Sequence, residues 1–140
     1  EMTTQGVGGP IDAALPLEGG LACLLGGNVR IDECPLGGEQ LSKARDGDWA
    51  AFKYLDFGSG AAQFHVTAAS VGGGSIELRL DSPIGPIAGR SNMPDTKGPD
   101  RYLSVSCPVE GACGVRALYL VFTGIREDGE MSMARFQFSR

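Results

Sequence analysis

Apolar and polar residues alternate with a period of two along much of the chain after residue 46. The alternation is clearest over residues 75–81, where three aliphatic side chains alternate with two acids and an arginine. Successive side chains of a strand point to opposite faces, so this segment predicts a strand with one face on a core. The run over 115–123 is apolar almost throughout, which is typical of a strand buried on both faces. Further strands are predicted at 63–68, 103–106 and 133–138.

Glycine and proline separate these segments. The chain has 22 glycines in 140 residues without a Gly-X-Y period, so the excess is assigned to turns. Residues 71–74 read as a hairpin loop between the strands on either side, and residues 81–86 as a turn. Residues 11–45 are irregular, and residues 1–10 are expected to be flexible. Short strands, many turns and no helical stripe predict one all-β domain over 1–140, an antiparallel β-sandwich.

Charge and hydropathy exclude two classes of partner. The net charge is -5, and lysine and arginine form no basic run. Binding to nucleic acid needs clustered cations that neutralise phosphates, so no nucleic acid partner is expected. No apolar stretch approaches the roughly 20 residues of a membrane span, so no membrane partner is expected either.

The four cysteines, Cys23, Cys34, Cys107 and Cys113, contain no CxxC pair, and the chain has one histidine. A zinc site is therefore disfavoured, and two disulfides are predicted, which implies an oxidising, extracellular compartment. The simplest pairing is local, Cys23 with Cys34 and Cys107 with Cys113, although four cysteines allow three pairings.

Four linked segments carry a family resemblance: Gly47-Asp48-Trp49, then residues 56–61, 74–83 and 118–124. In order and spacing they resemble the signatures of the family 6 carbohydrate-binding modules, most clearly over 47–138. The resemblance implies a jelly-roll, galactose-binding-like sandwich that binds sugar without catalysis and is attached to a polysaccharide hydrolase. The implied ligands are xylans, β-glucans and agarose.

In such modules the main sugar cleft lies among the loops at one edge, with a sugar held between two aromatic rings. The resemblance places Phe52 at the first ring, without the usual hydroxyl. Pro99 replaces the second ring, which leaves Tyr102, three residues on, as a candidate substitute. Ser132 stands where an asparagine is usual. The loop cleft is therefore expected to be weakened.

The concave sheet face is a second sugar site in some modules of this family. His65, Glu77, Arg79 and Tyr119 are the candidates there, because the charged members occupy outward positions of predicted strands. The alternative is a solvated polar face with cross-strand ion pairs. Trp49 is interpreted as core packing beside a turn, with sugar stacking as the alternative. If the chain binds an oligosaccharide, this face is expected to contribute more affinity than the loop cleft.

The family also commonly holds a structural calcium ion, whose acidic ligands fall here at Ala14 and Ala134. Calcium prefers six to eight oxygens, so neither this ion nor another cofactor is expected, although Asp12 stands nearby. No catalytic residue is predicted, since Gly58-Ser59-Gly60 is no nucleophile elbow and no carboxylate pair stands out.

The prediction is a secreted, monomeric module that delivers an attached enzyme to a polysaccharide. The alternative is a scaffold or protein-interaction domain on the same fold that has lost sugar binding.

Overall fold

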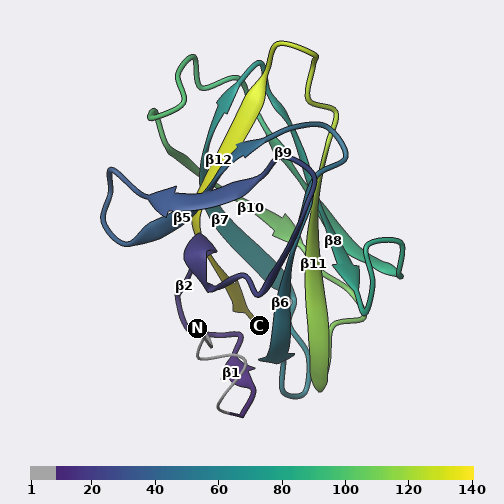
Figure 1. The fold of residues 1–140 in the computed structure, drawn as a ribbon. Coiled ribbons are helices and arrows are strands. Elements are labelled where there is room, and N and C mark those ends of the chain that lie inside the picture. The colour runs from purple at the N-terminus through teal and green to yellow at the C-terminus, as the bar shows by residue number, and fades with distance from the viewer. Residues whose placement is uncertain (1–8) are drawn as a thin grey trace.

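The computed structural model describes residues 9–140, which fold into two β-sheets packed face to face (Figure 1). Each sheet has six strands within these residues, and the one helical element there is a 3-10 turn, η1 (Gly19–Leu21). The prediction of an all-β sandwich is therefore confirmed.

Sheet A has the strand order β1-β6-β11-β8-β9, with β3 paired to the outer edge of β6. Its pairs are antiparallel except for β1 with β6, which is parallel. The strands are β1 (Ile11–Asp12), β3 (Leu24–Gly26), β6 (Trp49–Asp56), β8 (Gly74–Leu80), β9 (Ile87–Met93) and β11 (Val115–Thr123).

Sheet B has the order β10-β7-β12-β5-β4, with β2 paired to β12. Its pairs are antiparallel throughout the described residues. The strands are β2 (Leu17–Glu18), β4 (Arg30–Glu33), β5 (Glu39–Ala44), β7 (Gln63–Val71), β10 (Leu103–Pro108) and β12 (Glu130–Ser139).

The core fills the space between the sheets, and the period-two pattern sets which side chains enter it. In β11, Leu118, Leu120 and Phe122 are buried in the main core. On the other side of the same strand, Ala117 and Tyr119 are buried in a smaller cluster on the outer face. The interpretation of β11 as a strand buried on both faces is therefore confirmed.

Two sequence predictions about connectivity need correction. Residues 71–74 do not form a hairpin, because β7 belongs to sheet B and β8 to sheet A. The glycines there make a crossover from one sheet to the other. Residues 11–45, interpreted as irregular, contain β1 to β5. The flexible lead-in predicted for 1–10 lies outside the described residues, except for Gly9 and Pro10.

The prediction of two local disulfides is wrong for this structure, in which all four cysteines are free thiols. Cys23 donates its backbone N–H to Ala51 at the edge of sheet A, whereas Cys34 is buried after β4 of sheet B. Cys107 is buried on β10, while Cys113 is exposed in the following loop. The two cysteines of each predicted pair thus lie in different surroundings. Without disulfides, the cysteines no longer support the prediction of an oxidising compartment.

No helix in residues 9–140 has the length and apolar character needed to cross a bilayer.

Candidate functional site

The outer face of sheet A brings aromatic and charged side chains into one row. Trp49 of β6 lies opposite Val121 of β11, which lies opposite Glu77 of β8, which lies opposite Arg90 of β9. Tyr119 and Arg79 are opposite each other in the neighbouring row. We call this surface the sheet A face; its polar and aromatic side chains are Trp49, Lys53, Glu77, Arg79, Arg90 and Tyr119.

Two aromatic rings form the apolar part of the sheet A face. The ring centroids of Trp49 and Tyr119 are 5.4 Å apart at an interplanar angle of 51°. Tyr119 is only 6% exposed and belongs to the small outer cluster, whereas Trp49 is partly exposed and packs against that cluster. Trp49 thus packs against a hydrophobic cluster, as the sequence predicted, but this cluster lies on the outer face of sheet A and leaves part of the indole exposed. The indole is the more exposed of the two rings, and the Tyr119 ring packs against it.

The backbone of β3 also positions the indole. Gly26 pairs with Trp49 across the β3–β6 ladder. A Cβ atom on Gly26 would lie 2.2 Å from Cε2 of the Trp49 ring. Only a residue without a side chain leaves room for the indole at this place.

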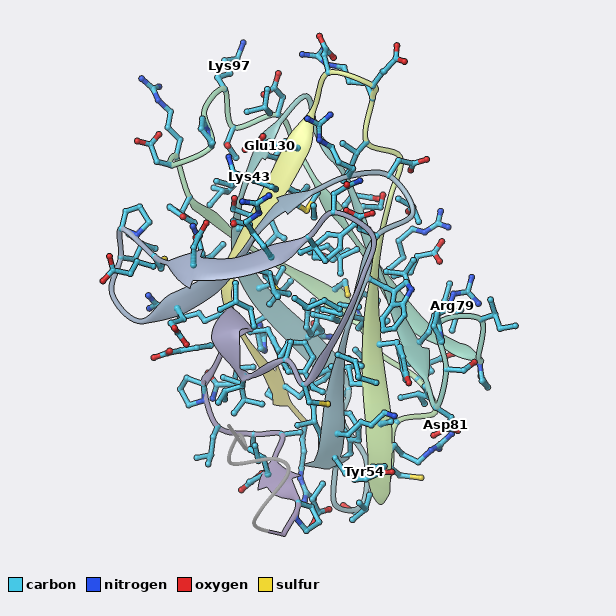
Figure 2. All side chains as sticks on the ribbon, in the orientation of Figure 1. Lys43, Tyr54, Arg79, Asp81, Lys97 and Glu130 are labelled. Atoms are coloured by element: carbon cyan, nitrogen blue, oxygen red, sulfur yellow. The ribbon has the colours of Figure 1, made fainter. Side chains whose placement is uncertain are left out.

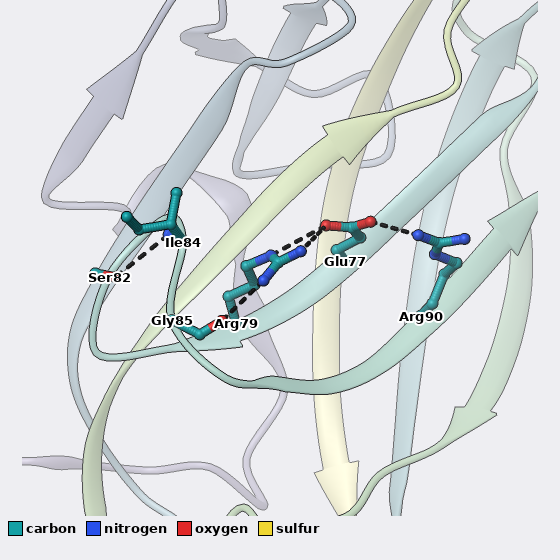
Figure 3. A network of polar contacts seen from close by, with 6 residues as sticks. All are labelled: Glu77, Arg79, Ser82, Ile84, Gly85 and Arg90. Carbon is teal, nitrogen blue, oxygen red and sulfur yellow. Dashed lines mark hydrogen bonds and ion pairs between the residues drawn. The ribbon is translucent and has the colours of Figure 1, made fainter.

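Glu77 is the centre of an ion-pair network beside the rings (Figure 3). Its Oε1 accepts hydrogen bonds from Nε of Arg79 at 3.1 Å and lies 3.0 Å from Nη2. Its Oε2 lies 2.5 Å from Nη2 of Arg90. Arg79 Nη1 also donates to the Gly85 carbonyl at 2.8 Å, which ties the 81–86 turn to the network.

This network keeps the Glu77 carboxyl ionised although its side chain is buried. Burial opposes ionisation, but the hydrogen bonds and charges of Arg90 and Arg79 outweigh it and hold the pKa of Glu77 below its usual value. The carboxylate therefore fixes two guanidinium groups at the surface. The alternative prediction for this face is a polar surface with cross-strand ion pairs. The pair of Glu77 on β8 with Arg90 on β9 is such an ion pair.

Directly after β8, Asp81 pairs with Arg116 through two hydrogen bonds of 3.0 and 2.6 Å. Figure 2 shows Arg79 and Asp81 on the same side of the molecule. The hydrogen bond from Arg116 lowers the pKa of Asp81. The charged pattern of the sheet A face thus continues toward the turn after β8.

The structure does not assemble the predicted loop cleft. Phe52 is 0% exposed and packs edge-on against Phe136 in the core, with ring centroids 4.9 Å apart. A sugar cannot stack on this ring, so its assignment to the cleft is corrected. The motif Gly47-Asp48-Trp49 correctly located strand β6. The side chain at position 52, however, points to the inner face of that strand.

Tyr102 and Ser132 belong to the sheet B side. The Tyr102 hydroxyl donates to Oε1 of Gln40 on β5. Burial, followed by a hydrogen bond with Cys34, raises the pKa of the Tyr102 hydroxyl above its usual range. Ser132 is buried on β12 opposite Ala69. The side chains of Lys43, Lys97 and Glu130 gather toward the end of the sandwich opposite β1, so charged groups occupy this end (Figure 2).

His65 is also misplaced by the sequence prediction, because it lies on the outer face of sheet B. Its Nδ1 is 2.7 Å from Oγ of Ser106, and its Nε2 is 2.8 Å from Oγ of Ser139. A shallow pocket of about 240 Å³ adjoins it, lined in part by Thr67 and Gln137. Of the four residues predicted for the concave face, the structure brings together Glu77, Arg79 and Tyr119 and separates His65.

The positions that align with the family's calcium ligands do not fit that ion. Ala14 and Ala134 have no side-chain oxygen, and Oδ1 of Asp12 accepts the backbone N–H of Ala14 at 2.9 Å. Calcium needs several carboxylate or carbonyl oxygens around one point. Over residues 9–140, no group of three or more histidine, cysteine or acidic side chains is arranged to hold a metal.

Sequence reasoning missed Trp49 and Arg90 as members of this site. Trp49 has outward parity relative to Phe52, but the aromatic positions were assigned by resemblance instead of parity. Arg90 follows a glycine in a segment without clear alternation, so no sequence signal placed it opposite Glu77.

The fold is that of a β-sandwich, and the comparisons with known proteins identify the class of module. The sequence model of the carbohydrate binding module (family 6) matches residues 26–140. The chain therefore belongs to this family.

Individual relatives agree with that assignment. An arabinoxylan arabinofuranohydrolase of Bacillus subtilis is 36% identical over 107 residues, 76% of this chain and 21% of the relative. A family 6 module of Clostridium cellulolyticum, solved with xylose, superposes with a TM-score of 0.86 at 31% identity, covering 92% of this chain and 99% of the other. A Clostridium stercorarium module solved with cellobiose has a TM-score of 0.87 at 29% identity, covering 96% and 99%. The chain spans about a fifth of the length of the arabinofuranohydrolase that it matches.

Proposed function

We propose that this chain is a non-catalytic module that binds a xylan or β-glucan chain through the sheet A face and delivers an attached enzyme to it outside the cell. The observation that carries the proposal is the partly exposed indole of Trp49 in one row with Glu77 and Arg90. The apolar C–H face of a sugar packs on an aromatic face, and fixed charged groups can orient its hydroxyls.

The choice of polysaccharide rests on relatives. The solved modules contain xylose and cellobiose, and the curated relative is an arabinoxylan-acting enzyme. Since the matching region is a small part of that enzyme, delivery of a catalytic domain is the role that fits this chain. The proposed extracellular location is supported by the kind of substrate in the relative's name, a plant polysaccharide.

Glu77 does not fit the part of a general acid on the sheet A face. A glycosidase needs one protonated carboxyl group that acts as general acid near a second, ionised carboxyl. The two arginines hold the pKa of Glu77 low, so this acid stays ionised and cannot donate a proton at neutral pH. Its role on the sheet A face is to accept hydrogen bonds and to fix the arginines.

Isothermal titration of the purified chain with xylotetraose and cellotetraose tests the proposal. Trp49→Ala should weaken binding by about tenfold or more, because loss of one stacking contact costs on the order of 1–3 kcal/mol by analogy with bases on aromatic rings. Trp49→Phe should retain part of the affinity. Tyr54→Ala is the matched control, since that ring is exposed on the same strand and lies at its other end.

Each outcome separates the candidates. If Trp49→Ala left the affinity unchanged and Lys43→Ala abolished it, the binding site would lie at the end of the sandwich opposite β1 instead of on the sheet A face. Absence of binding to any glycan would favour the scaffold or protein-interaction function.

A further inference from the structure

We infer that the sheet A face selects acidic glycans, chains that carry a uronic acid, and that Arg90 binds the carboxylate. The inference rests on the proposed sugar-binding function and adds the class of ligand. It is carried by the exposure and hydrogen bonding of Arg90 and by the local excess of positive charge.

The Arg90 guanidinium group has N–H donors that face solvent and are available to a ligand. Its side chain is 55% exposed, and its contact with Glu77 uses Nη2 alone. A guanidinium group has five N–H donors in a planar fork that matches a carboxylate with two parallel hydrogen bonds. In Figure 3 one nitrogen of Arg90 faces Glu77, and another lies on the side away from it.

Arg79 has a different role in the same network. Its Nε and Nη2 face Glu77, and its Nη1 binds the Gly85 carbonyl. With these nitrogens engaged inside the protein, Arg79 holds Glu77 in place. Glu77 in turn restrains Arg90, so binding a ligand carboxylate costs Arg90 less side-chain entropy than it costs a mobile arginine.

The charge around the rings favours an anion. Two arginines, Arg79 and Arg90, pair with one carboxylate, Glu77, on the sheet A face. The Lys53 ammonium lies 5.9 Å from the centroid of the Tyr119 ring. This local excess of positive charge occurs on a chain whose net charge is -5. The charged groups can hydrogen-bond the hydroxyls of any polysaccharide, but the net positive charge attracts an acidic polysaccharide more strongly than a neutral one.

The distance between the ring and the arginine determines the size of the probe. Trp49 and Arg90 are three strands apart in one row, about 14 Å at the usual spacing between strands. A single sugar cannot stack on the indole and reach Arg90 at once. The ligand is therefore an oligosaccharide with its acidic group some residues away from the stacked ring.

The test compares two xylo-oligosaccharides of equal backbone length, one neutral and one with a single glucuronic acid side group, by isothermal titration at low and high salt. The acidic oligosaccharide should bind about tenfold more tightly at low salt, and the difference should shrink at high salt because the pair is partly exposed. Arg90→Gln should reduce the difference to about twofold or less. Arg90→Lys, which retains charge without the fork, should give an intermediate preference.

Arg30→Gln is the matched control, because Arg30 is an exposed arginine on β4 of sheet B. It should retain the full preference for the acidic oligosaccharide. Circular dichroism melting curves establish that each variant is folded.

Equal affinities for the two oligosaccharides would overturn this inference and leave the proposed function standing. A preference that survives in Arg90→Gln would overturn the role of Arg90. Failure of both oligosaccharides to bind would overturn the proposed function as well.

Discussion

Replacement of Phe52 by alanine distinguishes a core residue from a sugar-stacking residue. The ring is 0% exposed and contacts Phe136 edge-on at 4.9 Å between centroids. Removal of a buried phenylalanine side chain loses its transfer free energy and leaves a cavity, which together cost about 3–5 kcal/mol. For a domain of this size each 1 kcal/mol lowers the melting temperature by roughly 3–4 °C, so Phe52→Ala should melt about 10–20 °C lower.

Thermal melting by circular dichroism and titration with xylotetraose measure the two effects separately. Tyr54→Ala is the control: Tyr54 is on the same strand and 52% exposed, so its removal should shift melting by only a few degrees. Titrated below its melting transition, Phe52→Ala should still bind sugar.

The opposite result is equally clear. If Phe52→Ala melted within about 3 °C of the wild type and lost sugar affinity, the ring would be part of a sugar clamp. The placement of β6 in the sandwich would then be wrong.

Three further results are expected. Gly26→Ala should displace the indole of Trp49, because the new Cβ would lie 2.2 Å from Cε2; since the chain has one tryptophan, its fluorescence should change and sugar binding should weaken, and an unchanged spectrum would contradict this. The pKa of Glu77 is lowered by folding, so its contribution to stability is complete above its unfolded pKa of about 4.3 and is lost as pH falls through the lower folded value; urea unfolding from about pH 6 to pH 3 should show a smaller loss in Glu77→Gln than in the wild type, and parallel curves would refute the coupling. Thiol titration of the denatured, unreduced protein should find all four cysteines free; in the native protein the exposed Cys113 should react first and the buried Cys34 slowly, whereas absence of free thiols would restore the disulfides.

The sequence alone predicted β7, β8, β10, β11 and β12, together with most of their inward positions. The alternation around Glu77 and the apolar run of β11 are local, because a strand sends successive side chains to opposite faces whatever its neighbours are. The linked motifs beginning with Gly47-Asp48-Trp49 led to the correct family for the same reason. They are stretches of chain whose turn and strand geometry depends on nearby residues.

The tertiary structure decided which strands became neighbours. Parity assigns a side chain to one face of its own strand, but it does not say which sheet that strand joins. His65 and Glu77 have outward parity on consecutive strands, and the crossover at 72–74 places them on opposite faces of the molecule. The partnership of Glu77 with Arg90 likewise follows from the register between β8 and β9. Strand pairing is a contact between distant segments, decided by packing of the whole core, and the proposed sugar-binding face depends on it.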